Sequence, residues 1–241
     1  MKNNLKRLYG VIAAVSIIVG LMAGSVSQVY AKDPNPGVIP PHAKAYGMTY
    51  GEWSAKWWQW AYSLPVDQNP FFDENGNCDH GANGQFGPVW FLTGVINVSG
   101  TAVRNCTVPA GKALFFPILN SECATLEGNG STEEVLRVCA KGLVEPISKL
   151  EAEIDGVPIQ KLWHYRAPSP LFTYGPLPAN NVLVMFGYVA PCGATSLSVA
   201  DGFYLMLEPL SVGQHTIHFA GTVGTFTLDI TYNLTVAQRR P

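Results

Sequence analysis

The sequence predicts a mainly β protein, an antiparallel β-sandwich of the jelly-roll or immunoglobulin-like type, with two helices packed against it. Short apolar runs separated by turn residues recur along the chain, which contains 24 Gly and 18 Pro among 241 residues. Strands and helices do not alternate in the rhythm of a parallel α/β sheet. Because hydrophobic residues make up 47% and charged residues only 13%, the chain has enough apolar surface to build a core.

Residues 1–31 are typical of a signal peptide. A basic head precedes an apolar stretch from Leu8 to about Met22, and Val29 and Ala31 fit the small-residue positions before a cleavage site. An uncleaved anchor is the alternative, because this stretch approaches the shortest length that spans a bilayer. We expect cleavage, and a periplasmic or secreted protein without a membrane span.

The charge balance disfavours nucleic acid as a partner. The chain has 15 Lys and Arg against 17 Asp and Glu, and three of the basic residues lie in the signal peptide, which leaves 12 and a formal charge of −5. A protein that binds nucleic acid needs the opposite balance. An extracytoplasmic glycan or protein is the expected kind of ligand.

The first helix is predicted near residues 50–63. Residues 32–46 form a Pro-rich, extended lead-in to a single domain of residues 47–241, and Thr49 with Glu52 then makes a capping box. Trp53, Trp57 and Trp60 share one helical face, which we expect to be buried. Trp58 projects away from that face, so it is the Trp closest to the surface and a candidate for ligand stacking.

The strands follow a loop rich in Asn, Asp and Gly. Apolar runs predict strands at residues 89–96, 101–108 and 113–119, and the first and third are nearly continuous in apolar residues, as strands buried on both faces are. A second helix is predicted near residues 131–145, with Ser131 and Glu134 as a capping box. Further strands are predicted at residues 150–154, 182–189, 203–210 and 225–236, with a turn at Asp155 and Gly156.

Three blocks of sequence together resemble a family of exported bacterial β-rich proteins of uncharacterised function. They are the Trp-rich residues 50–60, the residues 106–117, and the residues 201–204 continuing to 213–217. The resemblance implies an exported protein and supplies no activity. The last block is also similar to strand pairs of immunoglobulin-like sandwiches, which is a likeness of fold alone.

The five cysteines lie in the mature chain, where an oxidising compartment favours disulfides over metal ligation. No pair has the spacing of a zinc knuckle or a thioredoxin-type site. Pairing neighbours in the sequence predicts the bridges Cys78–Cys106 and Cys123–Cys139, with Cys192 left as a free thiol.

A calcium site is one candidate for chemistry. Asp73, Asn75, Asn77 and Asp79 alternate as the oxygen ligands of a calcium loop do. The pattern departs from an EF-hand, because Cys78 replaces the invariant Gly and Gly84 replaces the final Glu. A solvated loop held by a disulfide is the alternative.

Glu122 is the best single candidate for an acid catalyst, because it is the lone charge at the end of a buried strand. Glycoside hydrolysis needs a second acid, and Asp201, Glu52 and Asp73 are equal candidates. The sequence therefore favours an exported binding or structural module of unknown ligand over an enzyme. An extracytoplasmic hydrolase, acting on glycans through Glu122 and a second acid, is the alternative.

Overall fold

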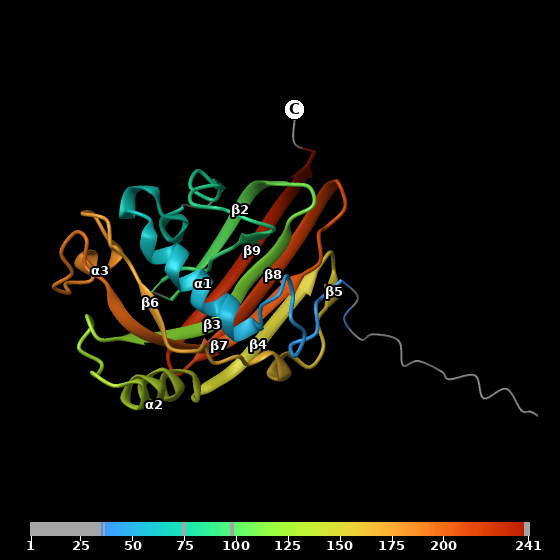
Figure 1. Cartoon of the computed structure of the whole chain (residues 1–241). Helices are drawn as coiled ribbons and strands as arrows, with labels where there is room; N and C mark the ends of the chain where they lie inside the picture. The colour runs from blue at the N-terminus through green and yellow to red at the C-terminus, as the bar shows by residue number, and fades with distance from the viewer. Residues whose placement is uncertain (1–34, 36, 74–75, 97–98, 239–241) are drawn as a thin grey trace, which may run out of the picture. The chain divides into compact units, whose positions relative to one another are not determined.

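The computed structural model describes residues 35, 37–73, 76–96 and 99–238, so the predicted signal peptide lies outside the described residues. The described part is mainly β, as expected, with two sheets and the helices α1 (Tyr50–Ser63), α2 (Glu133–Val144) and α3 (Val182–Met185) (Figure 1). Short 3-10 helices cover Val66–Gln68, Pro70–Phe72 and Leu162–Tyr165. Among the described helices, none is both long enough and apolar enough to cross a membrane.

The first sheet has the strand order β1-β3-β7-β6. Its strands are β1 (Val89–Phe91), β3 (Ala113–Ala124), β7 (Ser196–Leu207) and β6 (Phe172–Tyr174). The second sheet has the order β2-β9-β8-β4-β5. Its strands are β2 (Gly100–Pro109), β9 (Phe226–Ala237), β8 (Gly213–Val223), β4 (Ile147–Ile154) and β5 (Val157–Pro158).

Both sheets are mixed, so the expectation of purely antiparallel pairing is wrong. The pairs β1–β3 and β2–β9 are parallel, and the other pairs are antiparallel. The chain leaves the first sheet after β1, forms β2 in the second sheet and then returns to form β3. This crossover lets β3 run in the same direction as β1, where a hairpin would have reversed it.

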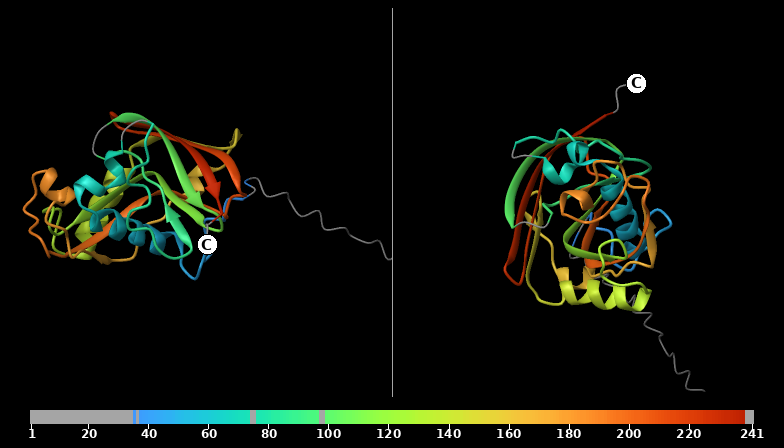
Figure 2. Two further views of the ribbon diagram at one scale, coloured as in Figure 1. Left: turned by 90° about the horizontal axis from the view of Figure 1, so that it is seen from above. Right: turned by 90° about the vertical axis from the view of Figure 1, so that its left-hand side faces the viewer.

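Strand β3 lies between α1 and the second sheet. The Phe115 ring packs edge-on against Tyr50 of α1, with 5.9 Å between ring centroids, and the Phe116 ring stacks on Phe219 of β8 at 5.0 Å. The right-hand view of Figure 2 shows α1 on one side of the molecule and β2 and β9 on the other. Burial on both faces explains the continuous apolar run of this strand and confirms the expectation from the sequence.

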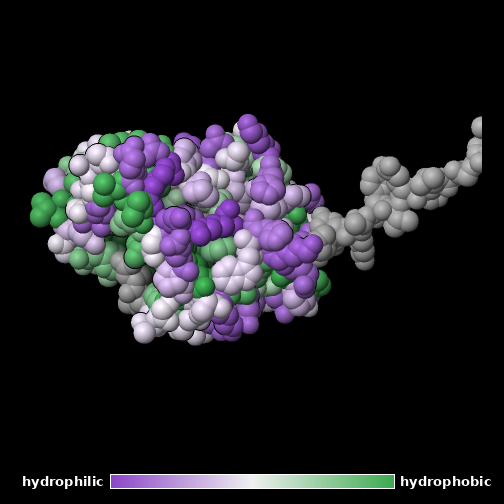
Figure 3. Space-filling view, turned by 90° about the horizontal axis from the view of Figure 1, so that it is seen from below, coloured by the Kyte–Doolittle hydropathy of each residue, from purple (hydrophilic) through white to green (hydrophobic). Residues whose placement is uncertain are grey.

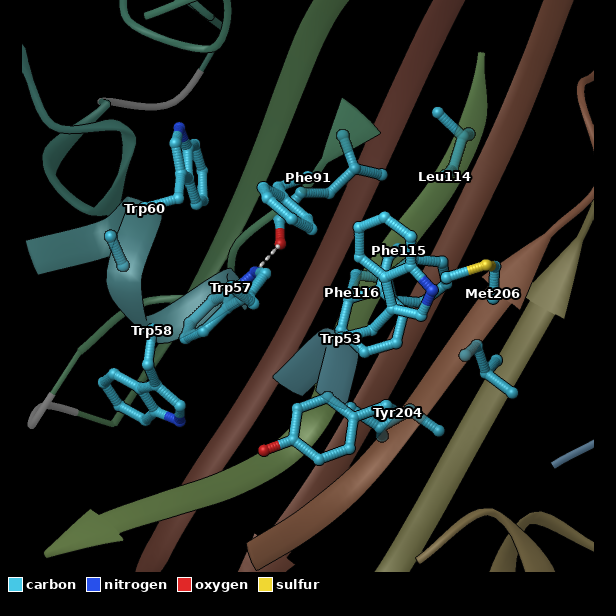
Figure 4. Close-up of a cluster of buried hydrophobic side chains, with 14 of the residues drawn as sticks. Trp53, Trp57, Trp58, Trp60, Phe91, Leu114, Phe115, Phe116, Tyr204 and Met206 are labelled. Carbon is cyan, nitrogen blue, oxygen red and sulfur yellow. Dashed lines mark hydrogen bonds between the residues drawn. The ribbon is translucent and has the colours of Figure 1, made fainter. Parts of the chain in front are cut away.

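Helix α1 has the predicted capping box and ends before Pro65, but all four of its Trp side chains are buried. Trp57 donates from its Nε1 to the Leu92 carbonyl at 2.9 Å. Figure 4 shows Trp58 and Trp60 directed to different sides of the helix. The expectation that Trp58 lies near the surface is wrong: it is 6% exposed, because the rings of Trp57 and Tyr62 pack against it and Tyr204 of β7 interacts with it.

Several other elements differ from the sequence-based expectation: β1 ends at Phe91 and not at residue 96, and β7 covers Ser196–Leu207 and not residues 203–210. The N-cap of helix α2 lies one residue after the predicted one, because Thr132 and not Ser131 accepts the backbone N–H of Val135. Residues 182–189 do not form the predicted strand. Asn181 caps the short helix α3 by accepting the N–H of Val184, and a turn at Gly187 follows.

Candidate functional site

A cavity of about 390 Å³ lies beside the buried side of Trp58. Helix α1 supplies Trp57, Trp58 and Tyr62 to its wall, and residues 117–122 of β3 supply another side. The ends of β8 and β9, the α2 residue Leu143 and the α3 segment complete the lining. A volume of this size fits a small organic molecule.

Glu122 enters this cavity from β3. The sequence placed it in a loop after the strand, but β3 continues to Ala124, so Glu122 is a strand residue paired with Ala200 of β7. Its carboxyl accepts a hydrogen bond from the Tyr62 hydroxyl at 3.2 Å and a short one from the Ser198 hydroxyl. The side chain is almost fully buried, which is costly for a carboxylate.

The second acid of the site is Glu127, which the sequence analysis did not propose. Its carboxyl lies 3.5 Å from the Tyr62 hydroxyl, the same group that binds Glu122. A turn in which the Gly128 N–H donates to the Thr125 carbonyl reverses the chain just after β3 and returns Glu127 to the cavity. The sequence contained one indication of this second acid: turn residues follow the strand, and Glu127 stands five positions beyond Glu122.

The three second acids considered from the sequence lie elsewhere. Asp201 forms a bidentate pair with Arg166, at 3.0 and 2.8 Å. Glu52 caps α1 by accepting the backbone N–H of Thr49 at 2.7 Å. Asp73 binds His80. None of these three lines the cavity.

Burial sets the electrostatics of the acid pair. Desolvation is the main cause that raises the pKa of Glu122 well above its usual range, and the neighbouring charge and hydrogen bond of Glu127 raise it further. The pKa of Glu127 is also raised by burial, while hydrogen bonds from Glu122 and Tyr62 oppose this rise. Both shifts have the same direction, so the pair retains a proton to higher pH than an exposed carboxyl does.

Two hydrogen-bond donors on the cavity wall interact with the buried Tyr204 hydroxyl. They are the indole Nε1 of Trp58 and the amide Nδ2 of Asn120, and both atoms are buried. Buried polar groups of folded proteins nearly always have a partner. The polar groups that remain for a ligand on this wall are the acceptor oxygens of the two carboxyls.

The predicted calcium ligands lie in the loop before β1, away from this cavity. Asp73 is buried and accepts the His80 backbone N–H at 3.1 Å, with the His80 Nδ1 2.5 Å from the same oxygen. Asn77 and Asp79 are exposed, and Asn75 lies outside the described residues. The described part of the chain contains no group of three or more His, Cys, Asp or Glu that could hold a metal. Calcium binding stays a prediction.

The predicted disulfides are confirmed, since Cys78 bonds to Cys106 and Cys123 bonds to Cys139. Cys192 is a free, exposed thiol. The first bridge ties the acidic loop to β2, and the second ties α2 to the strand that carries Glu122.

No protein-family model, curated protein or solved structure matches this chain significantly.

Proposed function

We propose that this chain is an exported binding protein that takes a small molecule into the cavity between α1 and β3. The observation that carries the proposal is the acid pair of buried Glu122 and half-buried Glu127, which has no ion-pair partner among the described residues and lies in a cavity large enough for a ligand. An apolar pocket with a few convergent polar groups is the usual form of a small-molecule site. The two disulfides support an oxidising compartment outside the cytoplasm.

A hydrolase that acts on glycans through Glu122 and Glu127 is the second candidate. The raised pKa of Glu122 favours it, because a general acid must hold its proton near neutral pH. The arrangement of the pair opposes it, because a hydrogen bond joins the two carboxyls, whereas the two acids of glycosidases lie roughly 5 to 9.5 Å apart. We therefore favour binding over hydrolysis.

Binding is tested with N-phenyl-1-naphthylamine, a neutral dye whose fluorescence rises in apolar sites. The wild-type protein should bind the dye in a saturable manner, and Val95→Trp, which fills the cavity from its wall, should abolish binding. Val212→Trp is the matched control, because Val212 is exposed and does not line the cavity. Equal dye binding by both variants would contradict the proposal.

Hydrolysis is tested with chromogenic glycosides and the Glu122→Gln variant. Turnover by the wild type that is lost in Glu122→Gln would favour the hydrolase. Dye binding without turnover of any glycoside would favour the binding protein.

A further inference from the structure

We infer that the ligand of this cavity is an organic ammonium ion, an amine on an apolar body, whose charged nitrogen lies between Glu122 and Glu127. This inference rests on the proposed function and adds the chemical class of the ligand.

The charge of the cavity wall is the first argument. Glu122 and Glu127 line the cavity, whereas no Lys, Arg or His does so among the described residues. Neither acid takes part in any ion pair that the described residues form. A negative charge on this partly desolvated pair has no cationic partner there, so a cation in the cavity would be stabilised and an anion repelled.

The geometry around the acids is the second argument. An ammonium group has three donors and no acceptor, and the two carboxyls beside the Tyr62 hydroxyl offer it several acceptor oxygens. The rings of Trp58 and Tyr62 lie together on the same wall, with 5.2 Å between their centroids. Aromatic faces attract cations and add to the attraction of the carboxyls.

The apolar body of the ligand follows from the rest of the lining. Ile118 and Leu119 of β3, Leu183 of the α3 segment and Phe226 of β9 face the cavity. Beside Leu183, the neighbouring Val184 and Met185 are exposed, and Figure 3 shows hydrophobic residues in green at the end of the molecule where α3 lies. Phe186 of the same segment also lines the cavity, so its wall suits the apolar body of an amphipathic molecule.

Binding of the ammonium ion changes the protonation of the pair. The ligand enters with its own positive charge, and the proton that the acid pair retains passes to the solvent. Both carboxylates are then ionised around one cation. Affinity for the amine should consequently rise with pH until the amine itself loses its proton.

The test compares three probes with the same chain and different heads: octylammonium, 1-octanol and octanoate. Isothermal titration calorimetry on the wild-type protein should give the tightest binding for octylammonium, about tenfold or more above octanol, and the weakest for octanoate. Titrations in buffers of different ionisation enthalpy should show release of a proton with octylammonium alone.

Variants separate the head group from the cavity. Glu127→Gln should weaken octylammonium about tenfold and leave octanol unchanged, because the apolar wall is intact. Glu133→Gln, on the outer part of α2, is the matched control and should alter neither. The comparison of probes on the wild type needs no variant, so a misfolded Glu127→Gln would not obscure the answer.

The outcomes distinguish the amine inference from the proposed binding function. If octanol or octanoate binds as tightly as octylammonium, or if none of the three binds while N-phenyl-1-naphthylamine does, the amine inference is overturned and the binding function stands. If neither the dye nor any probe binds, both fail.

Discussion

The Tyr62 hydroxyl donates to the Glu122 carboxyl at 3.2 Å, which joins α1 to β3 between residues 60 positions apart in the chain. Tyr62 is fully buried, and desolvation together with the nearby acids raises the pKa of its hydroxyl, so the group remains a donor. Helix α1 thus does more than cover the first sheet. It presents the hydroxyl that both acids of the cavity contact.

Removing this hydroxyl is the first prediction. Because the hydrogen bond from Tyr62 lowers the pKa of Glu122, Tyr62→Phe should raise that pKa further. It also leaves a buried carboxyl with one donor fewer, so the free energy of unfolding should fall by about 1 to 3 kcal/mol. Carbon-13 NMR titration of Glu122 and urea denaturation measure the two effects. Tyr46→Phe, at an exposed residue, is the control and should change neither.

The second prediction concerns the pH dependence of stability. The pKa of Glu122 is raised in the folded state above its ordinary value of 4.5, so the folded protein holds this proton more tightly than the unfolded chain. The free energy of unfolding should therefore fall as the pH rises from 4.5 towards the raised pKa of the folded state.

The Glu122→Gln variant should lose this fall, because an amide cannot ionise. Urea denaturation at about pH 5 and about pH 8 measures the difference, and the variant should gain stability relative to the wild type at the higher pH. Glu208→Gln, an exposed carboxyl outside the cavity, provides the comparison. A pH profile of Glu122→Gln parallel to the wild type would show that Glu122 is not the group that titrates.

The sequence predicted best where a local rule decides the structure. The capping box of Thr49 and Glu52 and the spacing of Trp53, Trp57 and Trp60 depend on residues within a few positions of one another, and both expectations are confirmed. The bridge Cys123–Cys139 could also be predicted from the sequence, because it closes a short stretch of chain.

The candidate site was harder to predict because tertiary contacts create it. Helical periodicity directs Trp58 away from the face of Trp53, Trp57 and Trp60, yet contacts with Tyr62 and Tyr204 bury it. The apolar residues 182–189 resemble a strand, but the cap at Asn181 makes a short helix of their first part. Glu127 is brought to Glu122 by the turn after β3. The pattern of residues does not predict the direction in which this turn sends the chain.

The third prediction is that Trp57 is central to the packing of α1. Its side chain is 1% exposed, and it packs against Phe71 and Trp60. Trp57→Ala should lower the free energy of unfolding by about 3 to 5 kcal/mol, because it leaves a large void and an unpaired Leu92 carbonyl. Lys56→Ala, on the exposed side of the helix, should change it little. Chemical denaturation of both variants decides, and an unchanged midpoint for Trp57→Ala would contradict the buried face.

The fourth prediction concerns calcium at the loop of Asp73, Asn75, Asn77 and Asp79. If the loop binds calcium in the folded state alone, calcium at 100 times its dissociation constant should add about 2.7 kcal/mol of stability. Thermal melts with millimolar calcium and with chelator measure this, and Asp79→Ala is a better variant than Asp73→Ala, because Asp79 is exposed while Asp73 supports His80. Identical melts would leave the segment as a solvated loop.

The last prediction concerns the bridge between α2 and the strand that carries the acid pair. Cys123 follows Glu122 in β3, so the two side chains point to opposite faces of the sheet. Cys123 is buried against α2 with Leu136, Ala140 and Val199, whereas Glu122 enters the cavity. Replacing both Cys123 and Cys139 by Ala should lower the free energy of unfolding by about 2 to 5 kcal/mol.

Cys192→Ala is the matched control for this pair, because Cys192 is exposed and free, and it should leave stability unchanged. Urea denaturation measures all three proteins, and mass mapping of the unreduced wild type identifies the bridges directly. A bridge between Cys192 and any of the other four cysteines would contradict the pairing. Since Leu143 of α2 lines the cavity, loss of the Cys123–Cys139 bridge should also weaken dye binding, whereas loss of Cys192 should not.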